Sequence, residues 1–386
     1  MDALGWMLVS LGAIFMAALV FDAVGQRTRL PRVTLLMLFG FASGPSGFDF
    51  LPDITEAWFP VVANMALVMV GFLLGGRLTL GELRQRGGPV IRISLAVVLI
   101  TFALVGLGLF AAGVPSPVAL VLAAVATATA PAATVDIVHE TGADTPFART
   151  LLDIVAVDDV WGLIMFSVAL AFCNLVAGDG AAHVLLHGAW DLGGALLLGA
   201  ALGVPMAYLT GRIEPGEPTL YEALGLVFLC GGIALLLNVS FLLAAMTMGA
   251  FVANLARHHT RPFHAIEGIE WPFMVVFFVL AGASLELGAL AHAGSWLAAY
   301  VALRIVGRVL GGWLGGSVPG APGSRRWMGL ALLPQAGVAL GMALVAAQSL
   351  PEIGGAILPV VVAATAIFEL IGPIATRSAL EQVAEG

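Results

Sequence analysis

The chain has 386 residues, of which 60% are hydrophobic and 10% are charged, and its mean hydropathy is +1.03. A soluble domain carries roughly 25% charged residues, so this composition excludes one and indicates an all-α polytopic membrane protein. The net charge of −8 is thinly spread and gives no sign of a nucleic-acid partner, and Cys173 and Cys230 both lie in apolar segments, which excludes a disulfide framework.

Thirteen apolar segments are predicted along the chain. The first follows no basic stretch and is expected to be a retained helix, and the second is short for a span that needs about twenty residues, so it is expected to be tilted or packed inside the bundle. The predicted segments are 4–24, 31–45, 58–78, 89–113, 117–139, 147–177, 188–212, 220–237, 240–256, 271–287, 295–316, 326–349 and 355–377.

The basic residues predict the orientation of these segments. All sixteen are arginines, and with thirteen spans all but two fall at ends or loops on one side of the membrane. The positive-inside rule makes that side cytoplasmic, so the N-terminus is expected outside and the C-terminus inside. The arginines on this side are Arg27, Arg29, Arg32, Arg77, Arg84, Arg86, Arg92, Arg149, Arg212, Arg257, Arg261, Arg325, Arg326 and Arg377.

Segment 117–139 contains Thr127, Thr129 and Pro131 in its middle, and segment 326–349 contains Pro334 and Gln335 at a similar depth. Each proline removes a backbone donor, so both helices are predicted to be interrupted there. Interrupted helices expose terminal carbonyl groups and positive N-termini that can hold ions, and Thr and Gln can complete such a site. Comparison of segments two to six with segments nine to thirteen predicts two repeats of inverted topology, each with its interrupted helix in fourth place.

Segment 147–177 contains two adjacent aspartates, Asp158 and Asp159, in the stretch LLDIVAVDDVWGLIMFSVALAF. A carboxylate at the centre of a membrane helix costs about 2.5 to 3.5 kcal/mol on insertion scales, so the pair indicates an ion site. Adjacent helical side chains point about 100° apart, and therefore the two cannot both face one partner. One is expected to meet a cation of the protein while the other binds either a proton or a monovalent cation.

Arg304 and Arg308 are the two arginines left over, and both lie mid-membrane in segment 295–316, on one helical face. A guanidinium keeps its proton, so a buried ion pair with the aspartates is predicted, with either arginine as the partner. A purely structural salt bridge between the two helices is the alternative.

Two further acidic residues have ordinary explanations. Glu369 is deep in segment 355–377 and needs a partner; Arg377, two turns on, is at the limit of reach, and a structural role is expected. Asp153 either lines a funnel below the pair or binds Arg149, one turn away.

With these residues in place, the chain resembles the sodium/proton antiporters of the Nha, Nap and Kef branch of the cation:proton antiporter superfamily. The motifs are TATAP, the DD-containing stretch, GRVLGG, LLPQAGVALGMAL and ELIGPIATRSAL, in that order over nearly the whole chain. The resemblance implies transport by movement of a core against a dimerising scaffold. Residues 1–80 and 220–287 would be scaffold, 89–178 and 295–377 core, and 188–212 a connecting helix.

The resemblance also assigns roles at the site. It implies that Asp159 carries the proton and the cation and that Asp158 pairs with the basic residue. This chain departs from its relatives in two places: Ala130 stands where some have a third acidic residue, so Thr127, Thr129 and the helix ends must compensate, and Arg308 stands where many have a lysine. Because arginine cannot release its proton, electroneutral exchange is slightly favoured, with the stoichiometry left open.

The predicted function is secondary-active antiport of a monovalent cation, Na⁺ before Li⁺ or K⁺, against protons by alternating access, with no enzyme activity and no cofactor. A sodium-coupled organic-solute symporter of similar fold is the alternative. An intramembrane aspartyl protease is disfavoured, because its two carboxylates must face each other across a water. The resemblance further implies a homodimer in the inner (plasma) membrane, with the lipid bilayer, the cation and the proton as partners.

Overall fold

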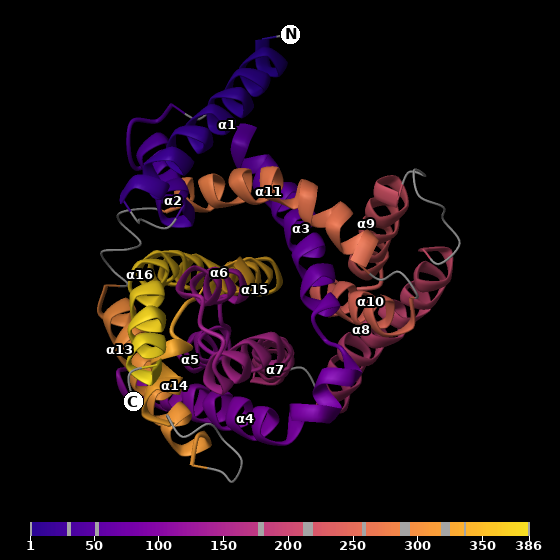
Figure 1. The fold of residues 1–386 in the computed structure, drawn as a ribbon. Helices are drawn as coiled ribbons and strands as arrows, with labels where there is room; N and C mark the ends of the chain where they lie inside the picture. Colours follow the sequence, from indigo (N-terminus) through magenta and orange to yellow (C-terminus); the bar gives the residue numbers. More distant parts are fainter. Residues whose placement is uncertain are drawn as a thin grey trace. The chain divides into compact units, whose positions relative to one another are not determined.

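The computed structural model describes residues 2–28, 32–50, 54–176, 181–210, 219–256, 260–285, 294–317, 325–335 and 337–384, and the elements within them are helices (Figure 1). They are α1 (Asp2–Thr28), α2 (Arg32–Ser43), α3 (Ile54–Gly76), α4 (Leu80–Ala111), α5 (Ser116–Val125), α6 (Pro131–Thr141), α7 (Pro146–Val176), α8 (Ala181–Thr210), α9 (Thr219–Leu236), α10 (Phe241–Leu255), α11 (Thr260–Ala283), α13 (Gly294–Gly315), α14 (Arg325–Ala331), α15 (Gly337–Ser349) and α16 (Pro351–Ala384).

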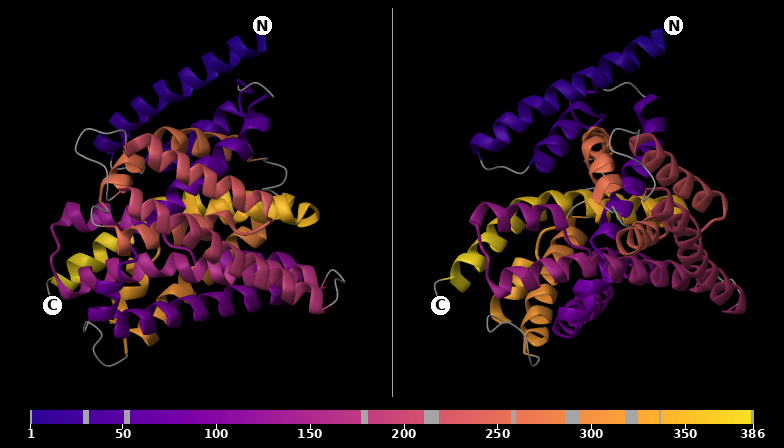
Figure 2. Two further views of the ribbon diagram at one scale, coloured as in Figure 1. Left: turned by 90° about the vertical axis from the view of Figure 1, so that its right-hand side faces the viewer. Right: turned by 45° about the vertical axis from the view of Figure 1, so that its right-hand side comes forward.

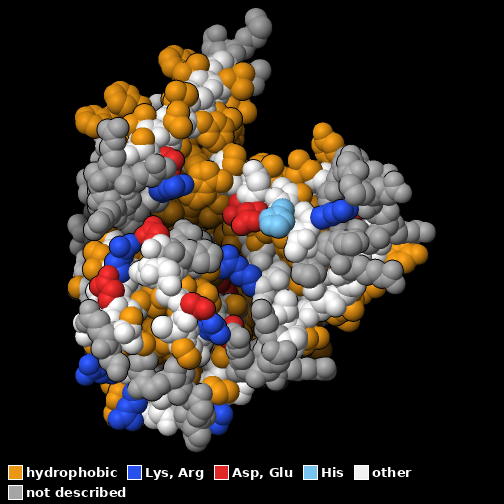
Figure 3. Space-filling model, viewed as in Figure 1, with side chains coloured by type: hydrophobic (Ala, Val, Ile, Leu, Met, Phe, Trp, Pro, Cys, Tyr) orange, Lys and Arg blue, Asp and Glu red, His pale blue; other side chains and the backbone are white. Residues whose placement is uncertain are grey.

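These helices confirm the predicted fold class. Segment 117–139 forms α5 and α6, segment 326–349 forms α14 and α15, and every other predicted segment corresponds to one helix. Among the described residues, eight helices are long and apolar enough to cross a bilayer, and five more are apolar but shorter. α1 is one uninterrupted helix (Figure 2), and much of its apolar surface is exposed, including Trp6 and Leu19, as expected of a membrane-facing helix (Figure 3).

By its internal contacts the chain divides into two compact units. The first comprises residues 1–63, 89–158 and 272–386, and the second comprises residues 64–88 and 159–271. The assignment of segments to a moving core and a scaffold stays a prediction.

A hydrophobic core in the first unit brings α4, α6, α7, α14 and α16 together. Its members are fully or almost fully buried, and they include Ile93 of α4, Leu151 of α7 and Leu332, which follows α14. Burial of such a side chain contributes roughly 1.5–3 kcal/mol in water, but in a bilayer close packing supplies much of the helix association. This core fixes α4, α7 and α14 to one another next to the two interruptions.

The short helix α2 packs closely against α11 in the same unit. A Cβ added to Gly40 would lie 1.9 Å from the Val279 carbonyl oxygen, and one added to Gly282 would lie 2.0 Å from that of Met37. Both glycines therefore allow the two backbones to touch, as small residues commonly do between membrane helices. This contact explains how a helix of 12 residues is accommodated within the bundle.

In the second unit α8 packs against α10, which also contacts α9. Glycines again permit the approach, since a Cβ on Gly199 would lie 2.4 Å from the Ala244 carbonyl oxygen. The side chain of Asn254 at the end of α10 donates to the Leu78 carbonyl at 2.7 Å and accepts from the Leu80 amide at 2.7 Å. Asn254 thereby holds the turn between α3 and α4.

Candidate functional site

The first interruption separates α5 from α6. α5 ends at Val125, α6 begins at Pro131, and the residues between are buried but not helical. Proline suits the first position of a helix, because it has no N–H to leave unpaired and its φ already matches the helix. The break leaves carbonyl oxygens free after α5 and a helix N-terminus at Pro131.

The second interruption separates α14 from α15. α14 ends at Ala331 and α15 begins at Gly337, and Pro334 and Gln335 lie buried between them. Gln335 Nε2 donates to the Tyr300 hydroxyl at 3.0 Å and to the Val125 carbonyl at 3.4 Å. The second bond ties this interruption to the end of α5.

α13 lies against both interruptions because glycines let it approach. A Cβ on Gly329 of α14 would lie 2.2 Å from the Arg308 carbonyl oxygen, and one on Gly312 of α13 would lie 2.3 Å from the Gly329 nitrogen. The two helices are thus in backbone contact at this point, and the α13 arginines lie beside the non-helical segments.

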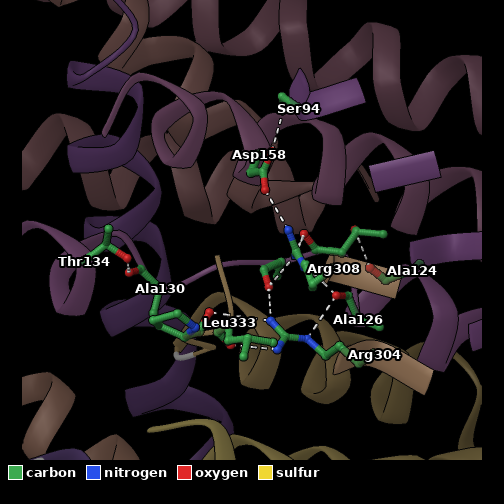
Figure 4. Close-up of polar contacts among 12 residues, drawn as sticks. Ser94, Ala124, Ala126, Ala130, Thr134, Asp158, Arg304, Arg308 and Leu333 are labelled. Carbon is green, nitrogen blue, oxygen red and sulfur yellow. Dashed lines mark hydrogen bonds and ion pairs between the residues drawn. The ribbon is translucent and has the colours of Figure 1, made fainter. Parts of the chain in front are cut away.

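The sequence left open which arginine meets Asp158, and in the structure Arg308 makes the contact (Figure 4). Arg308 Nη1 lies 2.8 Å from Asp158 Oδ2, and both side chains are fully buried. The Ser94 hydroxyl of α4 donates to Asp158 Oδ1. Arg308 Nη2 also donates to the carbonyls of the first interruption, at 3.0 Å for Ala128 and more closely for Thr127.

Arg304 binds backbone carbonyls of both interruptions (Figure 4). Its Nε donates to the Ala126 carbonyl at 3.1 Å, and its Nη1 donates to that of Leu333 at 2.7 Å. Nη2 donates to the Ala128 carbonyl at 2.9 Å, and the guanidinium carbon lies 4.1 Å from the centre of the Phe368 ring. Arg304 therefore joins the C-terminal ends of α5 and α14.

The two arginines lie where helix ends and a carboxylate meet. Each helix terminus carries roughly half an elementary charge, so the C-termini of α5 and α14 together present about one negative charge, and the N-termini of α6 and α15 about one positive charge. Arg304 donates to carbonyls beyond both C-termini. Arg308 and Asp158 form an ion pair.

Asp159 follows Asp158 in α7 and is also fully buried. Its side chain points about 100° away from that of Asp158, so the two carboxylates cannot share one face of the Arg308 guanidinium. Among the hydroxyls predicted as ligands, Thr127 Oγ1 donates to the Ala124 carbonyl at 2.6 Å. Thr129 Oγ1 is buried and has no hydrogen-bond partner in the described part of the chain. Ala130 is buried, and its carbonyl accepts from Thr134 Oγ1 at 3.1 Å.

Sequence reasoning missed two residues of this network. Ser94 gave no signal, because a serine in an apolar helix commonly bonds its own backbone. Tyr300 could have been found, since it lies one turn before Arg304 and two before Arg308 and so shares their face of α13.

The arginines considered as partners for Glu369 and Asp153 bind other carboxylates in the structure. Arg377 binds Glu140 of α6 at 2.5 Å and not Glu369, and Arg149 binds Asp144 at 2.6 Å. Within the described residues there is no group of three or more His, Cys, Asp and Glu side chains that could hold a metal ion.

Two interrupted helices that meet beside a buried Asp–Arg pair in a polytopic helical protein define a secondary transporter. The chain belongs to the sodium/hydrogen exchanger family, since the family model for the transmembrane sodium/hydrogen exchanger matches residues 12–382. The protein is thus a member of a family of cation/proton antiporters and not an enzyme.

The sequence identity between this chain and its individual relatives is low. The chain is 26% identical to cation/H⁺ antiporter 18 of Arabidopsis thaliana over 73% of its own length, but it spans 38% of that protein. It is 23% identical to the ammonium/H⁺ antiporter subunit AmhT of Alkalihalophilus pseudofirmus, over 84% of this chain and 80% of that one. The fold matches the sodium/proton antiporter MjNhaP1 of Methanocaldococcus jannaschii at pH 8, with a TM-score of 0.80, 19% identity and coverage of 98% and 99%.

Proposed function

We propose that this antiporter exchanges a monovalent cation, Na⁺ in the first place, for a proton at Asp159 by alternating access. Asp158 and Arg308 form a fixed neutral pair, and Arg304 holds the ends of the two interrupted helices together. The observation that carries the proposal is the buried Arg308–Asp158 contact of 2.8 Å, because it neutralises one carboxylate of the pair immediately beside the other.

A single buried carboxylate suffices for coupling. A proton and a cation cannot neutralise Asp159 at the same time, so each displaces the other. Because arginine keeps its proton, Asp159 by itself exchanges one proton for one cation. Competition also predicts that the cation concentration for half-maximal exchange rises about tenfold for each unit of pH below the range in which Asp159 ionises.

The cation is expected to bind a mixed set of oxygens. Thr129 Oγ1 is buried without a partner among the described residues, and the carbonyls after α5 lie close by in sequence. Hard cations prefer carboxylate, hydroxyl and carbonyl oxygens. Because AmhT is named as a subunit of an ammonium/H⁺ antiporter, ammonium belongs with Na⁺, Li⁺ and K⁺ among the cations to test.

The test is cation-driven proton movement in proteoliposomes with a pH-sensitive dye, each cation being added in turn. Asp159→Asn keeps the size of the side chain but removes the charge, and we expect it to abolish exchange. Asp144→Asn is the matched control, because Asp144 is exposed and outside the site, and it should transport like the wild type. Normal exchange by the Asp159→Asn variant would contradict the proposal.

The family assignment favours antiport over the sodium-coupled organic-solute symport considered above. Homodimer formation and location in the inner membrane, with the N-terminus outside and the C-terminus in the cytoplasm, belong to the same proposal. The resemblance in sequence and the distribution of arginines support them.

A further inference from the structure

Glu369 of α16 is a buried carboxylate that the proposed mechanism does not use. It is 3% exposed, and it forms no hydrogen bond or ion pair with any residue that the structure describes. Thr365, one turn earlier on the same helix, is fully buried, and its hydroxyl also has no partner in the described part of the chain. A carboxylate and a hydroxyl thus lie one turn apart on α16 with no partner among the described residues.

The cations nearest in sequence or space are engaged elsewhere. Arg377 binds Glu140 at 2.5 Å. Arg304 covers the ring of Phe368, the residue before Glu369, but its N–H groups donate to the carbonyls of the two interruptions. A structural ion pair consequently does not account for Glu369.

Glu369 lies on the face of α16 that packs against the second interruption. Thr376 donates to the Ala331 carbonyl at 3.0 Å, a Cβ on Gly372 would lie 2.6 Å from Pro334 Cα, and one on Gly354 would lie 2.5 Å from Ala347 Cα. α16 thus runs antiparallel to α14 and α15. At 100° per residue, Glu369 and these three residues fall within about 60° on the surface of an ideal helix, so they share one side of α16.

The helices packed against α16 include α2, α5, α6, α13, α14 and α15, and among their described side chains the cations are engaged elsewhere. α5 and α15 contain no ionisable residue, the only one in α2 is Arg32, which binds Asp22, and Arg325 and Arg326 lie at the far end of α14. α13 contributes Arg304 and Arg308, already described. α6 contributes Glu140, which binds Arg377, and the side chains of Asp136 and His139 on the same helix lie outside the described part of the chain.

A carboxylate in such a place is costly when charged. A bound proton removes this cost, because it neutralises the carboxylate.

We propose that Glu369 is a second proton carrier, which is protonated in the proton-loaded form and ionised in the cation-loaded form. The proposal rests on exchange at Asp159 as set out above. Asp159 would release one proton and Glu369 a second for each cation bound, so that the complete cycle moves two protons against one cation and one net charge.

The experiment measures the coupling ratio in proteoliposomes that hold fixed Na⁺ and pH gradients, with the membrane voltage varied. Exchange of two protons for one Na⁺ stops at a voltage set by the two gradients, whereas one-for-one exchange has a direction that voltage does not change. We expect a ratio of two for the wild type and of one for Glu369→Gln. Glu381→Gln is the matched control, an exposed glutamate on the same helix, and should keep the wild-type ratio.

Each outcome separates this proposal from exchange at Asp159. An unchanged ratio in a folded Glu369→Gln protein would overturn the role of Glu369, and so would complete loss of exchange, because a second carrier is not indispensable for the first. If the variant does not fold, the wild-type ratio decides, since a value of one rules out a second carrier. Normal exchange by the Asp159→Asn variant would instead contradict the proposed exchange at Asp159, on which the role of Glu369 rests.

Discussion

At the scale of single residues, the two arginines of α13 use the geometry of the guanidinium group. Arg308 binds a carboxylate with one terminal nitrogen and backbone carbonyls with the other. Lysine offers three donors from one point and cannot reach two sides in the same way. The arginine is therefore a structural bond across the first interruption as well as a counter-charge for Asp158.

Arg308→Lys is expected to retain the charge but to remove the hydrogen bond to the Thr127 carbonyl of the first interruption, to which Arg304 does not donate. Each buried carbonyl left unsatisfied costs about 1–3 kcal/mol, so we expect a lower melting temperature in detergent. Cation-driven exchange should persist at a reduced rate, because the charge beside Asp158 remains. The measurement pairs thermal denaturation with the proteoliposome assay.

Arg326→Lys is the control for this change. Arg326 is exposed and lies over the Trp327 ring, so its replacement should leave stability unaltered. If Arg308→Lys is as stable as the wild type, the backbone bonds of Arg308 contribute little, and Arg304 alone holds the interruption.

At the scale of helices, the prolines allowed both interruptions to be predicted. Pro131 and Pro334 lie within the non-helical breaks or at their edges, because a proline cannot continue the backbone ladder. The bonds of Arg304 could not be predicted, since their acceptors are backbone carbonyls that carry no side-chain signature. The partner of Arg377 was missed for a related reason: Glu140 lies on another helix, and sequence distance says nothing about that contact.

The contact between α13 and α14 gives a prediction at this scale. Gly312→Ala would place a methyl group 2.3 Å from the Gly329 nitrogen, where backbone cannot give way cheaply. Overpacking of this kind costs about 1–3 kcal/mol, and here it would also move the α13 arginines away from the interruptions. We expect both the melting temperature and the exchange rate to fall.

Gly294→Ala supplies the comparison on the same helix. A Cβ at Gly294 would meet no atom of the described residues within 4 Å, so this variant should match the wild type in both measurements. Equal behaviour of the two variants would mean that the close approach of α13 to α14 is not needed for exchange.

At the scale of the whole molecule, composition and segment count predicted the class of fold, and the match to MjNhaP1 over 98% of the chain agrees with them. The division into contact units had no sequence signature, because its boundaries fall inside continuous helices such as α7, between Asp158 and Asp159. The orientation in the membrane stays a prediction. It rests on the arginines, of which Arg29, Arg212 and Arg257 lie outside the described residues.

Labelling of introduced cysteines from the two sides of the membrane tests this orientation. Ala112 lies exposed after α4, in a connection predicted to face outside, and Glu381 lies exposed near the predicted cytoplasmic end of α16. Cys173 and Cys230 are buried and would be replaced beforehand by alanine. An impermeant maleimide applied to intact cells should label Ala112→Cys and should reach Glu381→Cys only after permeabilisation. The reverse pattern would place the arginine-rich side outside the cell, against the positive-inside rule, and would contradict the predicted orientation.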